Sequence, residues 1–301
     1  MKYYEFGQEN SELMVMLHGG GVSYRGMLPS AEEMAKVYHV VLVAYDGFNP
    51  DEPETEFQSP MDEAKRLGDY LVEHYGGKVD IFYGISYGCR VLMEVLADPR
   101  LTITTTIADG MGLRDYPNIR SKWGKDVYCF FFTEIFYAVM GHPGPRRKKF
   151  FAKISGRTLE EADRILYGKA TWKSWKTQDY FLIGRKTDYS LFTKTDMYLW
   201  YGIKGTVDKK LSANLAQLKR GGYPFEEKSS PIWATAVWPA NTRSNFRRKY
   251  RQRTGAPLKK QGGIQNDPAG DFGRNRFGRS PHAGMRLRHP QRRGGDGASL
   301  S

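Results

Sequence analysis

Cysteine is scarce in this sequence, and its scarcity argues against a disulfide framework and against a zinc site. Cys89 and Cys129 are the two cysteines among 301 residues, and they lie in unrelated contexts without Cys-x-x-Cys spacing. Closely spaced Cys and His residues are typical of zinc sites, and larger even sets of Cys indicate disulfide frameworks. We therefore predict no disulfide framework, no metal, no cofactor and a reducing compartment.

Long apolar runs are also lacking. The longest, residues 127–140, is interrupted by Thr133 and Glu134, and it is shorter than the roughly 20 residues that a transmembrane helix needs. The first ten residues, MKYYEFGQEN, contain neither an apolar core nor a small-residue cleavage site of the kind found in signal peptides. We therefore expect a soluble, cytoplasmic protein without a membrane span.

Acidic residues are rare in the last quarter of the chain. Residues 229–301 contain 15 Lys and Arg but 3 Asp and Glu, so this tail carries +12 of the total net charge of +13. It has only nine Leu, Ile, Val or Phe among its 73 residues, too few to offset the entropy of ordering. We expect a disordered tail and no specific nucleic-acid partner. Binding of nucleic acid or an anionic surface by charge alone stays as an alternative.

A serine within a glycine-flanked turn is the most informative feature that is present. An apolar run at 79–83 leads into Gly84-Ile85-Ser86-Tyr87-Gly88 and then into helix-forming residues. A tight strand-to-helix turn has no room for side chains at the two glycine positions, and it holds the serine hydroxyl clear of the backbone. The turn also directs the N–H of Tyr87 toward a substrate oxygen that gains negative charge. This pattern predicts Ser86 as a nucleophile and Tyr87 as an oxyanion donor.

A second glycine-rich loop follows the apolar run at 12–17. The loop reads His18-Gly19-Gly20-Gly21, and consecutive glycines let backbone N–H groups approach a ligand closely. We predict that Gly19 or Gly20 supplies the other half of an oxyanion hole, and that His18 is structural. The alternative for this loop is a flexible turn without a function.

Strand and helix patterns alternate along the first 110 residues. Apolar runs predict strands at 12–17, 39–45, 79–83 and 101–108, and helical spacing predicts helices at 28–37, 59–75 and 90–96. Such alternation predicts an α/β fold whose sheet is mostly parallel, with helices on both faces.

Residues 111–189 break this alternation, and we predict that they form a helical lid. They contain aromatic clusters and a capped helix that begins at Thr158. An equally acceptable reading is that most of these aromatic residues pack the insertion onto the core. A strand at 196–202, a helix at 207–219 and an edge strand at 223–228 are predicted to follow. The predicted division is a core of 1–110 and 190–228, a lid of 111–189 and a tail of 229–301.

This order of parts resembles the α/β-hydrolase family over residues 12–228. The specific motifs are His18 to Gly21 and Gly84 to Gly88. The resemblance implies hydrolysis of a carboxylic ester through an acyl-enzyme on Ser86, and the aromatic lid favours a small-molecule ester with an apolar acyl group. The family also uses an acid and a histidine that follow the serine in the chain. Asp208 is the best placed acid and Asp109 is the alternative, while an ordinary helix N-terminal role for Asp208 stays open.

The sequence departs from the family at the catalytic histidine. That residue is expected near 230–240, where this sequence has none. Histidines occur instead at His18, His39, His74, His142, His282 and His289. We expect a hydrolase that is impaired or inactive in this form, with His142 as the first candidate for a substitute base. A ligand-binding protein without catalysis, on the same fold, is the alternative.

A shifted reading frame after Lys228 is our hypothesis for this departure. The segment SSPIWATAVW at 229–238 can be encoded so that one restored G before it yields VFPDMGHGSL, which completes an apolar strand and supplies Gly-His-Gly. The codons of Trp233 and Ala234 force the first of these glycines, whereas the histidine depends on one third base. Sequencing the encoding DNA tests the hypothesis, and codons that cannot yield histidine would end it.

Overall fold

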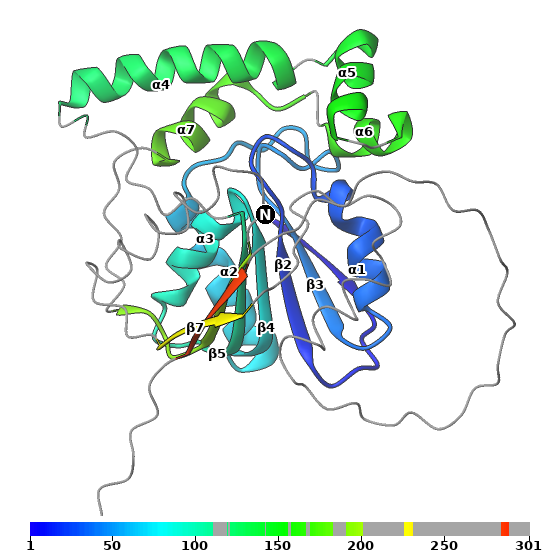
Figure 1. The fold of residues 1–301 in the computed structure, drawn as a ribbon, viewed down its shortest axis with the longest axis vertical. Coiled ribbons are helices and arrows are strands. Elements are labelled where there is room, and N and C mark those ends of the chain that lie inside the picture. The colour runs from blue at the N-terminus through cyan, green and yellow to red at the C-terminus, as the bar shows by residue number, and fades with distance from the viewer. Residues whose placement is uncertain are drawn as a thin grey trace, which may run out of the picture.

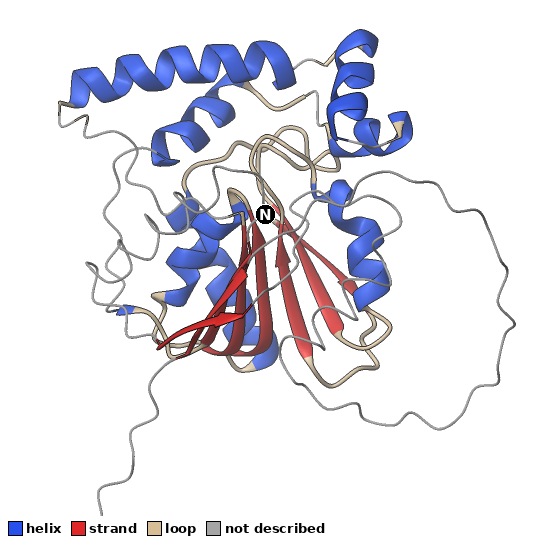
Figure 2. Cartoon of the chain, viewed as in Figure 1, coloured by secondary structure: helices blue, strands red, loops and turns tan. Residues whose placement is uncertain are grey.

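The alternation predicted from the sequence builds a single sheet with helices on both of its faces. The computed structural model describes residues 1–110, 119, 121–141, 143–155, 158–166, 169–182, 191–200, 226–230 and 284–288. In these residues the sheet lies between helices, and a separate helical layer lies over one end of its strands (Figures 1 and 2).

The described residues form an eight-stranded sheet in the order β1-β3-β2-β4-β5-β6-β8-β7. The strands are β1 (Lys2–Phe6), β2 (Leu13–Leu17), β3 (His39–Ala44), β4 (Lys78–Ile85), β5 (Thr102–Asp109), β6 (Asp196–Trp200), β7 (Glu226–Ser230) and β8 (Gly284–Arg288). Neighbours from β3 through β2, β4 and β5 to β6 are parallel. At the two edges, β1 is antiparallel to β3, and β8 is antiparallel to both β6 and β7. The prediction of a mostly parallel α/β sheet is confirmed.

Helices on both faces explain why strand β2, in the middle of the sheet, is apolar without interruption. All five residues of β2 are buried. Val15 and Leu17 pack in one cluster with residues of α2 (Pro60–Tyr75) and α3 (Gly88–Leu96). Met14 and Met16 pack in a second cluster with residues of α1 (Leu28–Met34). Because successive side chains of a strand point to opposite faces, a strand covered on both sides must be apolar at every position.

Helix α2 shows how local signals fix the ends of an element. Ser59 accepts a hydrogen bond from the N–H of Asp62 at 2.9 Å, and Pro60 occupies the first helical position. Gly76 ends the helix in the left-handed conformation, with φ of 60°. Both ends agree with the preference for serine and proline at helix starts and glycine at helix ends.

The helical layer over the carboxyl ends of the strands is called the helical cap here. It comprises α4 (Lys122–Phe136), the π-helical turn η2 (Tyr137–Gly141), α5 (Pro145–Ser155), α6 (Leu159–Ile165) and α7 (Trp172–Leu182). In Figure 1, α7 lies between α4 and the strands. The N-terminus of α6 is capped by Thr158, as predicted. The hydroxyl of Thr158 accepts a hydrogen bond from the N–H of Glu161, and the carboxylate of Glu161 accepts one from the N–H of Thr158.

Two strands were not expected from the sequence. Strand β1 has charged residues at Lys2 and Glu5 and no apolar run, so its assignment depends on pairing with β3 rather than on its own pattern. Strand β8 lies in the tail, where we expected no strand; its sequence GMRLR alternates apolar and basic residues over too few positions to stand out. The short 3₁₀ helix η1 (Tyr24–Met27) was likewise not predicted.

The predicted edge strand at 223–228 overlaps β7, which lies at the edge of the sheet. The predicted helix at 207–219 and most of the tail lie outside the described residues. The division into core, lid and tail stays a prediction.

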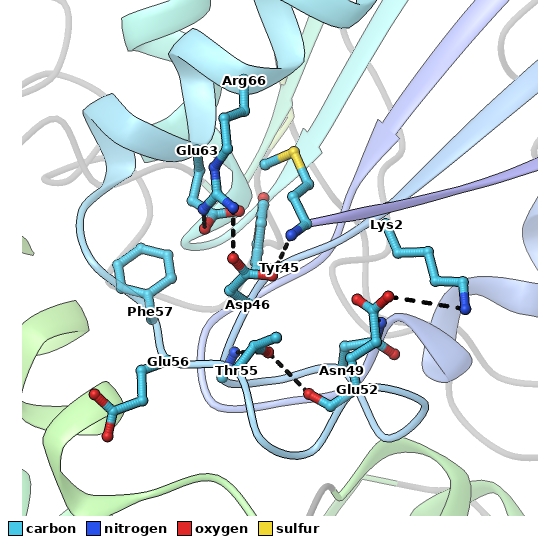
Figure 3. A network of polar contacts seen from close by, with 12 residues as sticks. Lys2, Tyr45, Asp46, Asn49, Glu52, Thr55, Glu56, Phe57, Glu63 and Arg66 are labelled. Atoms are coloured by element: carbon cyan, nitrogen blue, oxygen red, sulfur yellow. Dashed lines mark hydrogen bonds and ion pairs between the residues drawn. The ribbon is translucent and has the colours of Figure 1, made fainter.

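A polar network fastens α2 to the loop that follows β3 (Figure 3). The guanidinium of Arg66 donates to Glu63 at 2.6 Å and also to Asp46, which pairs in addition with the amino group of Met1. Glu63 is fully buried, and its burial raises the pKa of this carboxyl to about 8, against the opposing effect of Arg66. The guanidinium of Arg66 therefore joins a buried carboxyl of α2 to a carboxylate of the loop after β3.

Replacing Glu63 with glutamine should flatten the pH dependence of stability. A carboxyl whose pKa is higher in the folded state binds more protons when folded, so the free energy of unfolding falls as pH rises from about 4.5 to about 8. Urea unfolding at several pH values would measure this slope in Glu63→Gln. Asp62→Asn is the matched control, because Asp62 contacts the same Arg66 at 2.9 Å with a 43% exposed side chain. An equal slope in wild type and Glu63→Gln would contradict the assignment.

Candidate functional site

Ser86 occupies the turn between β4 and α3, and its backbone conformation is unusual. Its φ is +52°, and among the described residues it alone of the non-glycine residues has a positive φ. Such a conformation costs on the order of 1–3 kcal/mol and is retained where the surrounding structure enforces it. Ser86 is exposed, whereas Tyr87 and Gly88 beside it are buried. The turn therefore presents the serine side chain to solvent at the carboxyl edge of the sheet.

The two glycines of the turn are required by close backbone contacts. A Cβ on Gly88 would lie 2.6 Å from the carbonyl oxygen of Leu17 and 2.8 Å from that of His18. A Cβ on Gly84 would lie 3.0 Å from the carbonyl carbon of Gly88. The first turn of α3 thus packs directly on the end of β2, and the glycine spacing follows from that contact.

The glycine loop after β2 lies beside Ser86. A Cβ on Gly19 would lie 3.6 Å from the Cβ of Ser86, and a Cβ on Gly20 would lie 2.9 Å from the Cβ of Tyr87. Within the described residues, the N–H groups of Gly19, Gly20 and Tyr87 have no hydrogen-bond acceptor. The structure thus brings together the serine and the two backbone segments that the sequence analysis selected as oxyanion donors.

His18 is buried, and both of its ring nitrogens are occupied. Nδ1 donates to the carbonyl oxygen of Gly19 at 2.8 Å, and Nε2 accepts from the N–H of Tyr45 at 3.3 Å. This pattern fits the neutral imidazole with the proton on Nδ1, because a carbonyl can only accept and an amide N–H can only donate. Burial lowers the pKa of His18 to about 4. His18 holds the loop after β2 against β3 and is not available as a base.

The other described histidines lie near the amino ends of the parallel strands, away from the ends that carry the serine turn and the glycine loop. His39 begins β3, and its Nε2 is 2.7 Å from the carboxylate of Glu5. His74 lies in the last turn of α2, against the ring of Tyr70. His142, His282 and His289 are outside the described residues. In the described part of the chain, no histidine forms a hydrogen bond with Ser86.

Of the two candidate acids, the structure describes Asp109. It is the last residue of β5 and is buried, and its carbonyl oxygen accepts from the N–H of Ser86 at 2.8 Å. Its carboxylate accepts from the hydroxyl of Tyr83 at 2.9 Å. Asp109 is thus bound to the backbone of the serine turn, while Asp208 lies outside the described residues.

The buried thiol beside this turn has a structural role. The thiol of Cys89 donates to the carbonyl oxygen of Gly84 at 3.1 Å, and burial raises its pKa well above the ordinary value. A thiol of this kind remains protonated and is a poor nucleophile. Ser86 therefore stands as the nucleophile candidate of the turn.

Helix α7 of the helical cap contacts the glycine loop directly. The N–H of Gly21 donates to Oε1 of Gln178 at 2.8 Å. The ring of Trp175 lies where a side chain on Gly21 would be, and Gly21 itself has a φ of +65°. Trp175 belongs to the aromatic residues of the insertion, none of which was predicted to contact the glycine loop, and Gln178 was missed. No local pattern marks a glutamine whose partner is 157 residues away.

Comparison with solved structures identifies the fold of this chain. No protein-family model matches the chain, and no curated protein matches its sequence. Among solved structures, an α/β-hydrolase family protein of Desulfitobacterium hafniense superposes with a TM-score of 0.55 at 17% identity, over 72% of this chain and 86% of that one. A thermophilic esterase of Thermogutta terrifontis gives a TM-score of 0.53 at 14% identity, over 83% and 93% of the two chains. The chain has the α/β-hydrolase fold.

The serine turn and the glycine loop follow the carboxyl ends of the parallel strands β4 and β2, and Asp109 ends β5, which is parallel to β4. Helix α7 of the helical cap contacts the glycine loop. The cap enters the chain between β5 and β6, as the sequence analysis expected for its insertion. The described residues contain no group of three His, Cys, Asp or Glu side chains that could hold a metal ion. They also contain no helix with the length and apolarity needed to cross a bilayer.

Proposed function

We propose that this protein is a serine hydrolase of carboxylic esters, with Ser86 as its nucleophile. The observation that carries the proposal is the exposed side chain of Ser86 on a backbone with φ of +52°, where the first turn of α3 meets the glycine loop. A strained conformation that the surrounding packing enforces, with two sets of free N–H groups beside it, is the arrangement that acyl transfer requires.

The proposed reaction runs in two steps. The Oγ of Ser86 attacks the ester carbonyl carbon, and the N–H groups of Tyr87 and of Gly19 or Gly20 donate to the oxygen as it becomes negative. The tetrahedral intermediate expels the alcohol, which takes up the proton that Ser86 loses, and an acyl-enzyme remains. Water then cleaves this ester and restores the serine. The aromatic residues of the helical cap favour an apolar acyl group.

Proton transfer is the weak step of this proposed mechanism. A histidine normally takes the proton from the nucleophile and an acid orients that histidine, and Asp109 or Asp208 is our candidate for the acid. No described histidine forms a hydrogen bond with Ser86, and both ring nitrogens of His18 are occupied. Members of such a triad act as a unit, and a site that lacks one retains the contribution of substrate binding and of the oxyanion donors. We therefore propose slow acyl-enzyme formation and weak turnover in this chain.

Covalent labelling tests the proposal. A fluorophosphonate probe should modify Ser86 slowly, and Ser86→Ala should abolish the labelling completely, because the probe phosphonylates the nucleophile itself. Ser11→Ala is the control, since Ser11 is also exposed but lies in the loop before β2. Peptide mass spectrometry would identify the modified residue, and a short-chain aryl ester assay would give turnover. Equal labelling of wild type and Ser86→Ala would refute the proposal. Rapid labelling with rapid turnover would show that another residue, with His142 the first candidate, acts as base.

The missing histidine favours one alternative function. A protein of this fold that binds a small ligand without turning it over needs neither a base nor a reactive serine. On that alternative, Ser86 would not react with the probe, and Ser86→Ala would leave ligand affinity unchanged.

A further inference from the structure

Helix α4 exposes a row of large apolar side chains on its outer face. Trp123, Phe130, Phe131 and Ile135 are 77%, 45%, 62% and 64% exposed. Their separations of seven, eight and twelve residues place them on one face of a helix. In Figure 1, α4 lies on the side of α7 that faces away from the sheet.

The other face of α4 is the one that packs against the protein. Cys129 and Thr133 are buried there, and the hydroxyl of Thr133 donates to the carboxylate of Asp179 on α7 at 2.9 Å. Within the row, Phe130 also contacts Trp172 of α7, whereas Trp123, Phe131 and Ile135 are each at least 62% exposed. Contiguous exposed apolar surface of this kind indicates a binding surface.

Positive charge lies next to this row. Residues 122–155 contain seven Lys and Arg against two Asp and Glu. Helix α5 exposes Arg146, Arg147, Lys149 and Lys153, together with Phe150 at 62% exposure. The guanidinium of Arg147 donates to the carbonyl oxygen of Ala138, an exposed residue just beyond the end of α4. The basic helix thus begins beside the end of α4, and the apolar row together with these cations is called here the outer cap face.

Most of the basic side chains that α5 exposes form no ion pair with an acidic residue of the described part of the chain. Within the described residues, Arg146, Lys149 and Lys153 form no ion pair, whereas Lys148 pairs with Asp163. Glu134 is an exposed acid within the apolar row. The outer cap face as a whole therefore combines a positive field with apolar side chains that water solvates poorly.

We propose that the outer cap face binds the surface of an anionic phospholipid bilayer. Trp and Phe side chains favour the boundary between headgroups and acyl chains, and adjacent Arg and Lys side chains bind headgroup phosphates. A second copy of this chain fits less well, because a symmetric contact would bring two basic α5 helices together. Nucleic acid would use the cations but gains nothing from Ile135 and Phe131. The inference concerns the cap alone and holds whether or not Ser86 reacts.

Vesicle binding with a lipid-depth readout tests this inference on the full chain. The vesicles are made of phosphatidylcholine with brominated acyl chains, either with or without phosphatidylglycerol. Bromine quenches the emission of a tryptophan that reaches the acyl chains, and we expect this quenching only when the anionic lipid is present. Comparison with Trp123→Phe assigns the quenching to Trp123 among the six tryptophans. Phe131→Ala with Ile135→Ala should weaken binding by about tenfold or more, through loss of buried apolar area. Glu134→Gln should strengthen it.

Matched controls separate this surface from the basic tail and from self-association. Leu191→Ala removes an equally exposed apolar side chain, 63% accessible, outside the cap, and should leave binding unchanged. One outcome would overturn the inference: the variant with Phe131→Ala and Ile135→Ala still binds vesicles, and the emission of Trp123 is not quenched. The membrane contact would then be assigned to residues 229–301. Absence of vesicle binding, with a dimer in solution that these substitutions dissociate, would assign the face to a second copy.

Discussion

Replacing Gly88 with alanine is expected to lower the free energy of unfolding by about 3 kcal/mol or more, or to prevent folding. The added Cβ would lie 2.6 Å from the carbonyl oxygen of Leu17 and 2.8 Å from that of His18. Both atoms belong to backbone at the end of β2, which cannot move aside as the end of a flexible side chain can. The urea midpoint of unfolding, followed by circular dichroism, would measure the loss.

Gly144→Ala is the control for this substitution. No atom lies within 4 Å of a Cβ at Gly144, and its φ is not positive, so the change should be close to neutral. If Gly88→Ala were as stable as wild type, the turn would have to be looser than the contacts with β2 indicate, and the placement of Ser86 beside the glycine loop would be wrong. The prediction therefore tests the geometry of the site separately from its chemistry.

Local patterns were sufficient to predict the parts of the site that depend on the backbone. The glycines at 84 and 88 indicated the turn, because a strand, a tight bend and a helix in succession leave few residue types possible at those positions. The loop of His18 to Gly21 was selected for the same reason, and the structure places it beside Ser86. The structural role expected for His18 follows from its two hydrogen bonds.

Contacts between distant segments could not be predicted in this way. Gln178 reaches Gly21 across 157 residues, and neither residue carries a local signal of the other. Strand β1 likewise owes its assignment to pairing with β3, and β8 owes its place to pairing with β6 and β7. Pairing of this kind is a property of the assembled sheet. The sequence did show the aromatic residues of the insertion, but it did not show which of them, such as Trp175, face inward and which, such as Phe131, face solvent.

The contact of α7 with the glycine loop links the cap to the proposed chemistry. Oxyanion donors act only if they are already directed at the reacting oxygen, and the loop that carries Gly19 and Gly20 is supported on its outer side by Gln178 and Trp175. The amide of Gln178 takes the N–H of Gly21, which leaves the preceding N–H groups of the loop for a ligand. Helix α7 is therefore part of the support of the site as well as part of its cover.

Replacing Trp175 with alanine should accordingly affect both stability and the reaction of Ser86. Trp175 is buried, and its ring packs against Phe48 on the core and against Gly21. Loss of a buried tryptophan side chain typically costs about 3–5 kcal/mol. Because Nε1 of Trp175 has no hydrogen-bond partner within the described residues, the expected loss comes from packing alone. The free energy of unfolding and the rate of fluorophosphonate labelling should both fall.

Trp172→Ala separates these two effects. Trp172 lies on the same helix but is only half-buried, and its ring contacts Phe130 and Lys176 within the cap rather than the glycine loop. Its loss should cost less stability and leave the labelling rate of the folded protein unchanged. Labelling would be measured well below the urea midpoint of each variant, so that unfolded protein does not contribute. If both variants labelled at the wild-type rate, α7 would serve only to cover the site, and the support of the oxyanion loop would have to come from the sheet.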